Sequence, residues 1–256
     1  IARPNVALGT LFTLPLQFAA ILSGAIIPEF LVNVQGFRPQ QIAPALTATL
    51  LPQVLSYTLC AGALHFRMLE TRVALILGLA LVAVGCFCDL TVTSDWTADN
   101  FLPGQIIQGV GLPFIILPLL SIFIADVNPH EGIQAACIFN VMRSLSTTIA
   151  AAWAATTMRL SAQNKYDELV TNTAFYSKGH QTMLATIENY FGKTESDPLH
   201  LHAQALQLIA AATRKQAATL STADTIATLG WTLLASCFAV VLMPRLGRGN
   251  PEQNSS

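Results

Sequence analysis

An arginine stands near the middle of the apolar stretch 133–158, where a charge is costly. Asn140 precedes Arg143 by three residues, and Ser144, Thr147 and Thr148 follow it closely. A charged side chain within a membrane helix faces the bundle interior or a water-filled cavity by default. We therefore expect the Arg143 guanidinium either to clamp neighbouring helices or to contact a substrate or a coupling carboxylate, as its planar fork of donors allows.

Glutamines lie in three other apolar stretches. Gln105 and Gln108 share one face of a helix at spacing i, i+3, and Gln53 and Gln17 each follow a proline closely. Amide side chains inside a membrane bundle either line a cavity or hold neighbouring helices by hydrogen bonds. Both roles stay open for these residues.

Carboxylates matter because proton-coupled transport needs a group that titrates while the membrane shields it. Glu29 follows Pro28 at the outer end of the first apolar stretch, Asp89 lies near the outer end of the third, and Asp126 lies just past the fourth. None stands at mid-membrane. If the chain is half of a proton antiporter, we expect its main proton carrier in the other half.

Composition indicates a membrane protein rather than a soluble one, and the motifs give no indication of an enzyme. Hydrophobic residues make up 53% of the chain and charged residues 11%, against roughly 25% charged in soluble domains. The net charge of −1 gives no indication of nucleic-acid binding. No nucleophile or phosphate-binding motif occurs. The cysteine pair Cys86 and Cys88 is followed by Asp89 but has no His close by in sequence, and two thiols make a poor metal site. We predict no catalytic residues, no metal and no cofactor.

Apolar stretches long enough to span a bilayer, which takes about 20 residues, occur six times. They cover 6–28, 42–64, 73–92, 101–125, 133–158 and 225–243. Their continuous apolar character favours helices over strands. Lys and Arg in the short loops place both termini in the cytoplasm. The sequence therefore predicts an all-α, multi-pass protein of the inner (plasma) membrane, with the lipid bilayer as its first partner.

Domain limits follow from these spans. Five helices occupy 1–158, an extracytoplasmic loop 159–224, the last span 225–243 and a cytoplasmic tail 244–256. The loop region holds 12 of the 27 Lys, Arg, Asp and Glu residues. An apolar stripe from Leu199 to Leu220 predicts a helix there, packed on the membrane surface or the bundle, or serving as a docking surface.

Several segments resemble C-terminal halves of drug:proton antiporters of the EmrB/QacA type, within the major facilitator superfamily. The resemblance covers essentially the whole chain. The segments, in chain order, are Pro28-Glu29-Phe30-Leu31, Gly36-Phe37-Arg38-Pro39, Leu51-Pro52-Gln53-Val54, Gln105 to Gly111 with Pro113 and Pro118-Leu119, Phe139-Asn140-Val141-Met142-Arg143, and Arg214-Lys215-Gln216-Ala217 with Asp224. One departure is Phe66, which stands where the family's inner-loop turn has an Asp.

The resemblance implies a six-helix bundle equivalent to one half of such a transporter. It also implies proton-driven export of lipophilic or amphipathic small molecules by alternating access, with the missing N-terminal half as partner. In Gram-negative members a periplasmic adaptor and an outer-membrane channel join the pump. The start at Ile1, without Met, leads us to expect a fragment.

Two other functions stay open. One is a transport-inactive membrane scaffold derived from a transporter half, which the substitution at Phe66 and the lack of mid-membrane acids would suit. The other is nutrient transport by a different branch of the superfamily. Substrate contacts, if the chain is a transporter, are expected at Arg143, Asn140, Gln105, Gln108, Gln53, Gln17 and Glu29.

Overall fold

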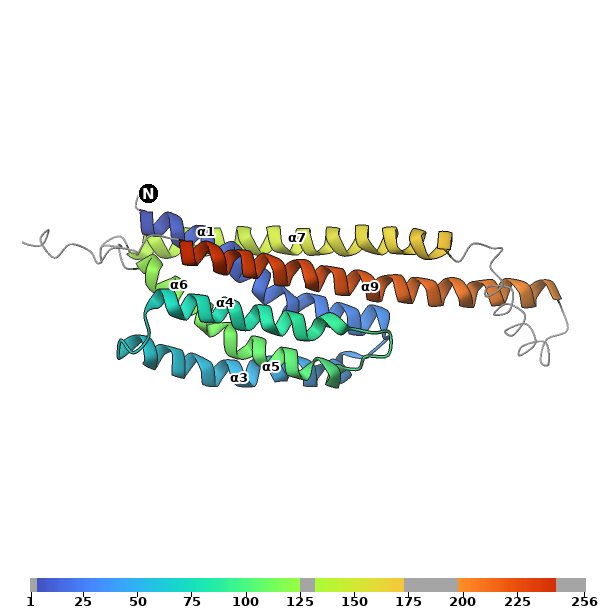
Figure 1. Ribbon diagram of the computed structural model, residues 1–256, viewed down its shortest axis with the longest axis horizontal. Helices are drawn as coiled ribbons and strands as arrows, with labels where there is room; N and C mark the ends of the chain where they lie inside the picture. The colour runs from blue at the N-terminus through green and yellow to red at the C-terminus, as the bar shows by residue number, and fades with distance from the viewer. Residues whose placement is uncertain (1–3, 125–131, 173–197, 243–256) are drawn as a thin grey trace, which may run out of the picture.

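The computed structural model describes residues 4–124, 132–172 and 198–242, and these residues are helical apart from short connections (Figure 1). The elements are α1 (Pro4–Ile21), η1 (Leu22–Ile26), α2 (Ile27–Glu29), η2 (Phe30–Val34), α3 (Pro39–His65), α4 (Thr71–Cys88), η3 (Asp89–Thr91), η4 (Ala98–Phe101), α5 (Leu102–Gly111), α6 (Pro113–Ile124), α7 (Gly132–Asn172) and α9 (Pro198–Leu242). No strand occurs among them.

Six helices are long and apolar enough to cross a membrane, as the sequence predicted. They are Phe12–Val34, Pro39–His65, Thr71–Thr91, Ala98–Ile124, Gly132–Thr171 and Leu206–Leu242. The predicted all-α, six-span class is therefore confirmed at this level. The predicted cytoplasmic tail 244–256 lies outside the described residues.

The first span runs further than predicted because a proline is accommodated inside it. Pro28 does not end the helix, which continues to Val34 through two π-helical turns. Proline lacks an N–H, and its ring crowds the carbonyl four residues earlier. The first π turn relieves this crowding, with the Ile27 N–H donating to the Leu22 carbonyl five residues back. Gly36, at φ +71°, then ends the helix.

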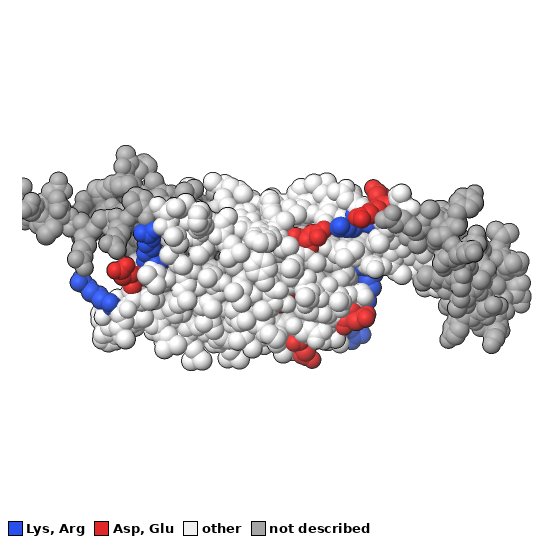
Figure 2. All heavy atoms as spheres, viewed as in Figure 1, with Lys and Arg blue, Asp and Glu red and all other residues white. Residues whose placement is uncertain are grey.

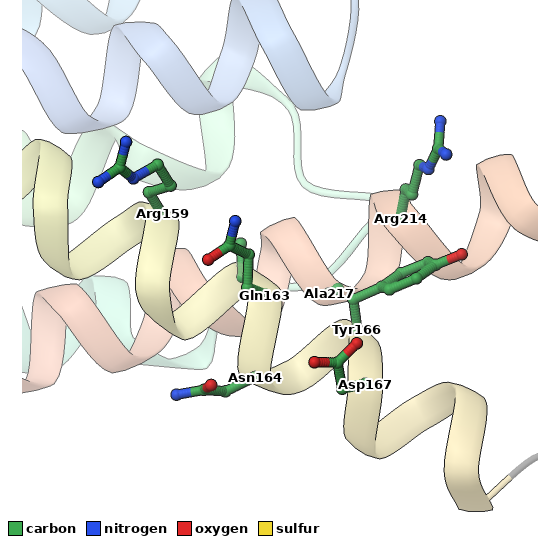
Figure 3. Close-up of a pocket in the computed structure, with 8 residues that line it drawn as sticks. Arg159, Gln163, Asn164, Tyr166, Asp167, Arg214 and Ala217 are labelled. Carbon is green, nitrogen blue, oxygen red and sulfur yellow. The ribbon is translucent and has the colours of Figure 1, made fainter.

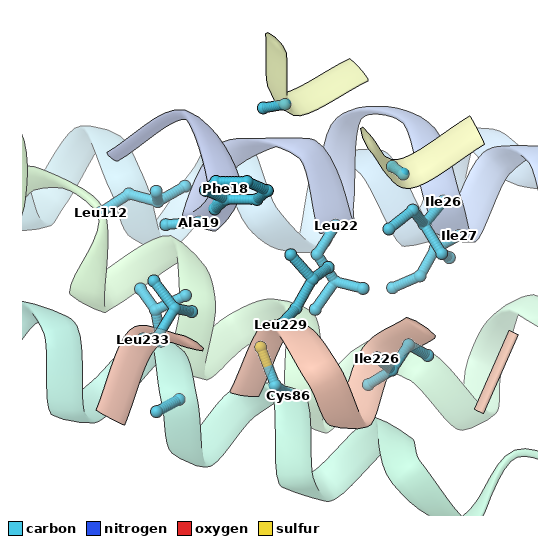
Figure 4. Packing of buried hydrophobic residues seen from close by; sticks show 14 of the residues in the cluster. Phe18, Ala19, Leu22, Ile26, Ile27, Cys86, Leu112, Ile226, Leu229 and Leu233 are labelled. Carbon is cyan, nitrogen blue, oxygen red and sulfur yellow. The ribbon is translucent and has the colours of Figure 1, made fainter. Parts of the chain in front are cut away.

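The core lies where the first span, α4 and α9 meet. Leu22, Ile226 and Leu229 are fully buried there (Figure 4). Lipid is as apolar as these side chains, so burial alone does not hold the bundle together, and close packing and hydrogen bonds must contribute. Figure 2 shows a broad uncharged band across the bundle, with charged side chains gathered toward its two ends, as a bilayer requires.

The last two spans extend beyond the other helices. With 41 and 45 residues, α7 and α9 are about 60 and 68 Å long, roughly twice the hydrocarbon thickness of a bilayer. Figure 1 shows them side by side beyond the ends of α3, α4 and α5. The helix predicted at Leu199–Leu220 exists within α9. It continues directly into the last span, and Figure 1 shows the start of α9 extending beyond the end of α7 before the two helices run side by side.

Two hydrogen bonds join α7 to α9 where the charged region begins. Ser221 Oγ donates to the Met158 carbonyl at 2.6 Å, and Ser161 Oγ donates to Asp224 Oδ2 at 3.0 Å. The region predicted as a loop, 159–224, is therefore helical at both ends, through Asn172 and from Pro198. Residues 173–197 are outside the described part of the chain.

The start of α1 and the end of α9 lie at the same end of the bundle (Figure 1). At that end Arg72, on α4, donates from Nε to the Val240 carbonyl at 3.1 Å and from Nη2 to the Val241 carbonyl. These carbonyls belong to the last described turn of α9. Arg72 thus caps the described end of α9, and the orientation of this end toward the cytoplasm stays a prediction.

Candidate functional site

A buried polar cluster joins three helices. Gln105 and Gln108 both point from α5 into the bundle, as their spacing allows. Thr49 Oγ1, on α3, donates to Gln105 Oε1, and Gln108 Nε2 donates to Asp89 Oδ2 at 3.0 Å. All four side chains are at most 6% exposed. Both glutamines therefore form hydrogen bonds between helices, which is one of the two roles predicted for them.

Three polar atoms of this cluster have no hydrogen-bond partner although they are buried. They are Asp89 Oδ1, Gln105 Nε2 and Gln108 Oε1. The Gln105 amide interacts with the same carboxyl group, although its Nε2 makes no hydrogen bond of normal geometry. Buried polar groups are nearly always paired. Three unpaired atoms in one cluster therefore leave room for further hydrogen bonds there, for example to a proton or a water molecule.

Glycines bring the helices of this cluster into close contact. A Cβ at Gly104 on α5 would lie 2.1 Å from Asp89 Oδ1, and a Cβ at Gly85 on α4 would lie 2.5 Å from Gln108 Cγ. Small residues let membrane helices approach closely. The carboxyl and amide groups are thus enclosed by backbone, in an arrangement that suits a proton better than an organic substrate.

A second polar region lies on the outer face of α7. Asn140, Arg143, Ser144, Thr147 and Thr148 are all exposed, and their spacing places them on one side of the helix. Most of them bond back to their own helix, as Asn140 Nδ2 does to the Ala136 carbonyl at 3.0 Å. Within the described residues the Arg143 guanidinium has no hydrogen bond or ion pair, so the predicted clamp is not formed there.

The opposite side of α7 packs on α1. Thr13 and Ser146 share a hydrogen bond of 2.9 Å, and Gln17 Nε2 donates to the Arg143 carbonyl at 3.3 Å. Gln17 therefore lies next to the backbone of Arg143. The structure thus brings Gln17 on α1 and Arg143 on α7 together, and Asn140 precedes Arg143 by about one turn of α7.

Two of the predicted site residues form no side-chain hydrogen bond to either polar region. Gln53, on α3, is half-buried, and its amide makes no hydrogen bond within the described residues. Glu29 is exposed on the first span. Asp89, by contrast, is buried in the cluster, although its position near the end of the third span gave it little weight in sequence reasoning. The sequence signal that could have identified Asp89 is a carboxylate that directly follows a long run of apolar residues.

A shallow groove lies between the extended parts of α7 and α9. Arg159, Gln163, Tyr166, Asp167, Arg214 and Ala217 are among the residues that line it (Figure 3). Its arginines are exposed, and no buried polar group points into it. The groove offers a polar surface beyond the apolar part of the bundle.

No metal-binding group of three or more His, Cys, Asp or Glu side chains occurs among the described residues. No protein-family model matches the chain, and no curated protein or solved structure matches it either. The arrangement of polar groups within the six spans therefore carries the functional argument.

Proposed function

We propose that the chain is the C-terminal half of a proton-coupled efflux transporter that exports lipophilic or amphipathic small molecules by alternating access. The observation that carries this proposal is the uncovered polar face of α7. In that span 11% of the most apolar window is buried, against 22–50% in the other five. An arginine and four polar side chains are poorly solvated by lipid, so this face requires a water-filled passage or a second bundle.

The composition of this face suits an amphipathic compound. Beside the polar arc, Val141, Leu145 and Ile149 are exposed by 65, 51 and 44%. Binding sites for small molecules are mostly apolar with a few polar groups that set orientation. A passage between α7 and a second six-helix half would present both kinds of surface, with Arg143 as the charged contact.

The resemblance of the sequence to EmrB/QacA-type antiporters supports the same function. On that basis the partners are the N-terminal half, a small-molecule substrate and protons. A periplasmic adaptor and an outer-membrane channel would join in a Gram-negative cell. The location is then the inner membrane, with both termini cytoplasmic.

The test is dye efflux from cells that express the chain alone or together with the N-terminal half of its transporter. We expect efflux that a protonophore abolishes, and only when both halves are present. Arg143→Ala should abolish it. Arg159→Ala is the matched control, because Arg159 is an exposed arginine of the same helix, about 24 Å further along, and it should leave efflux intact.

The alternative is a membrane scaffold without transport activity. The observation that favours it is the extension of α7 and α9 with its polar groove, which could hold a partner protein away from the bilayer. If a correctly inserted chain gives no efflux in any combination, this alternative gains and the transporter proposal fails. Equal efflux from Arg143→Ala and wild type would remove Arg143 from the substrate path.

A further inference from the structure

Asp89 and Gln108 are joined by a single side-chain hydrogen bond. The Gln108 amide donates one hydrogen bond to Asp89 Oδ2 at 3.0 Å. The other oxygen of each group, Asp89 Oδ1 and Gln108 Oε1, is buried without a partner. A carboxyl group and a primary amide can share two parallel hydrogen bonds, but only if each supplies one donor.

The missing donor identifies the species that completes the pair. An ionised carboxylate only accepts hydrogen bonds, so its second oxygen and the amide oxygen would both be acceptors. A protonated carboxyl carries an O–H, which can donate to Gln108 Oε1. One proton on Asp89 Oδ1 would therefore satisfy two of the three unpaired atoms in the cluster.

No described residue offers a cation that would stabilise the ionised form. Asp89 forms no ion pair in the described part of the chain, where the ion pair is Lys165–Glu168. The neighbouring helix α5 brings only amide side chains to the carboxyl, and Cys86, one turn earlier on α4, is the titratable group that interacts with it. A buried charge without a cation or several donors is strongly disfavoured.

We propose that Asp89 is a proton-binding site of the bundle, carrying its proton on Oδ1 in a two-bond pair with Gln108. Release transfers this proton to water and leaves a carboxylate, which breaks the O–H···O bond. Gln105 Nε2 then serves as the replacement donor, since it lies beside the carboxyl and is unpaired. Gln105 is also bonded to Thr49, so this exchange would act on α3.

The proton site deepens the proposed function, and only its role in coupling rests on that function. In a transporter, the bound proton would hold Asp89, at the end of α4, to Gln108 on α5. Its loss would pass the carboxylate to Gln105, the residue of α5 that is bonded to α3. The two polar regions of the bundle would then have separate roles. The α7 face would contact substrate and the Asp89 cluster would bind the proton.

The direct test is infrared spectroscopy of the purified chain in lipid nanodiscs at neutral pH. We expect a carboxylic-acid C=O band that shifts in D2O and disappears in Asp89→Asn. Asp99→Asn, which alters an exposed carboxylate of η4, is the matched control and should keep the band. A wild-type spectrum without this band, or a band that survives in Asp89→Asn, would overturn the proposal.

A second variant keeps the test decisive if Asp89→Asn does not fold. Gln108→Leu leaves the acid in place but removes its amide partner, so the band should move to higher frequency rather than vanish. An unmoved band would overturn the pairing with Gln108.

In the dye-efflux assay, Asp89→Asn should remove the protonophore-sensitive component. If the wild-type pair shows no efflux while the infrared band is present, the transporter function fails and the proton site stands. If efflux in Asp89→Asn stays protonophore-sensitive, coupling through Asp89 is refuted.

Discussion

Replacing Gly104 with alanine should damage the polar cluster directly. The new Cβ would lie 2.1 Å from Asp89 Oδ1 and 2.5 Å from its Cγ, whereas carbon and oxygen lie roughly 3.3 Å apart even in short C–H···O contacts. The carboxyl group would have to move by about 1 Å. Because Gln108 Nε2 is now 3.0 Å from Asp89 Oδ2, that movement would break the hydrogen bond.

The expected loss of unfolding free energy combines three effects. Overpacking in a tight site costs about 1–3 kcal/mol, and leaving buried hydrogen-bonding groups unpaired costs about 1–3 kcal/mol. Alanine favours a helix over glycine by about 1 kcal/mol, which offsets part of this. We expect Gly104→Ala to destabilise the chain by about 3 kcal/mol.

The assay is equilibrium unfolding in mixed micelles, followed by circular dichroism. Gly62→Ala is the matched control, since Gly62 also lies in a helix and nothing lies within 4 Å of its added Cβ; this variant should be neutral or slightly stabilising. In an Asp89→Ala background the clash is gone, so Gly104→Ala should cost little. Equal stability of Gly104→Ala and Gly62→Ala would refute the close contact between Gly104 and Asp89.

Three local features give further predictions in the same unfolding assay. Arg67→Gly should stabilise the chain by about 1 kcal/mol, because Arg67 has φ +53°, a backbone region that costs residues with a Cβ roughly 1–2 kcal/mol. No gain in stability, or the same gain from Arg67→Ala, would contradict this. Arg72→Met should destabilise by about 1–3 kcal/mol and speed amide exchange at the end of α9, and unchanged exchange there would refute the cap. Thr13→Val and Ser146→Ala should be non-additive by about 0.6 kcal/mol, whereas strict additivity would deny their hydrogen bond.

The six spans could be predicted because lipid imposes one rule on every residue of a crossing helix. A continuous apolar run must satisfy its own backbone hydrogen bonds, so length and composition suffice. The helix limits were harder to predict. Pro28 marked a helix end in sequence, but a π turn absorbs it. Charges after Arg159 suggested a loop, yet α7 continues to Asn172 because polar residues are no barrier to a helix outside lipid.

The candidate site was only partly visible in the sequence. Arg143 could be singled out because one charge inside an apolar run is conspicuous. The pairing of Gln108 with Asp89 and of Gln105 with Thr49 could not, since 19 and 56 residues separate the partners. Their contact depends on how closely α3, α4 and α5 pack. Asp89 was assigned to the membrane edge by counting residues, and its burial arises from helices far away in sequence.

Coupling between the proton site and the rest of the bundle is most direct through α3. A Cβ at Gly109, on α5, would lie 2.3 Å from the Thr49 carbonyl, so the two helix backbones touch one turn from the Thr49–Gln105 hydrogen bond. A shift of α5 that follows proton release must therefore move α3 or separate from it. The α3 span is buried over 22% of its most apolar window, so few packed side chains oppose such a movement. Rearrangement of α3 would accordingly be the first structural response to losing the proton.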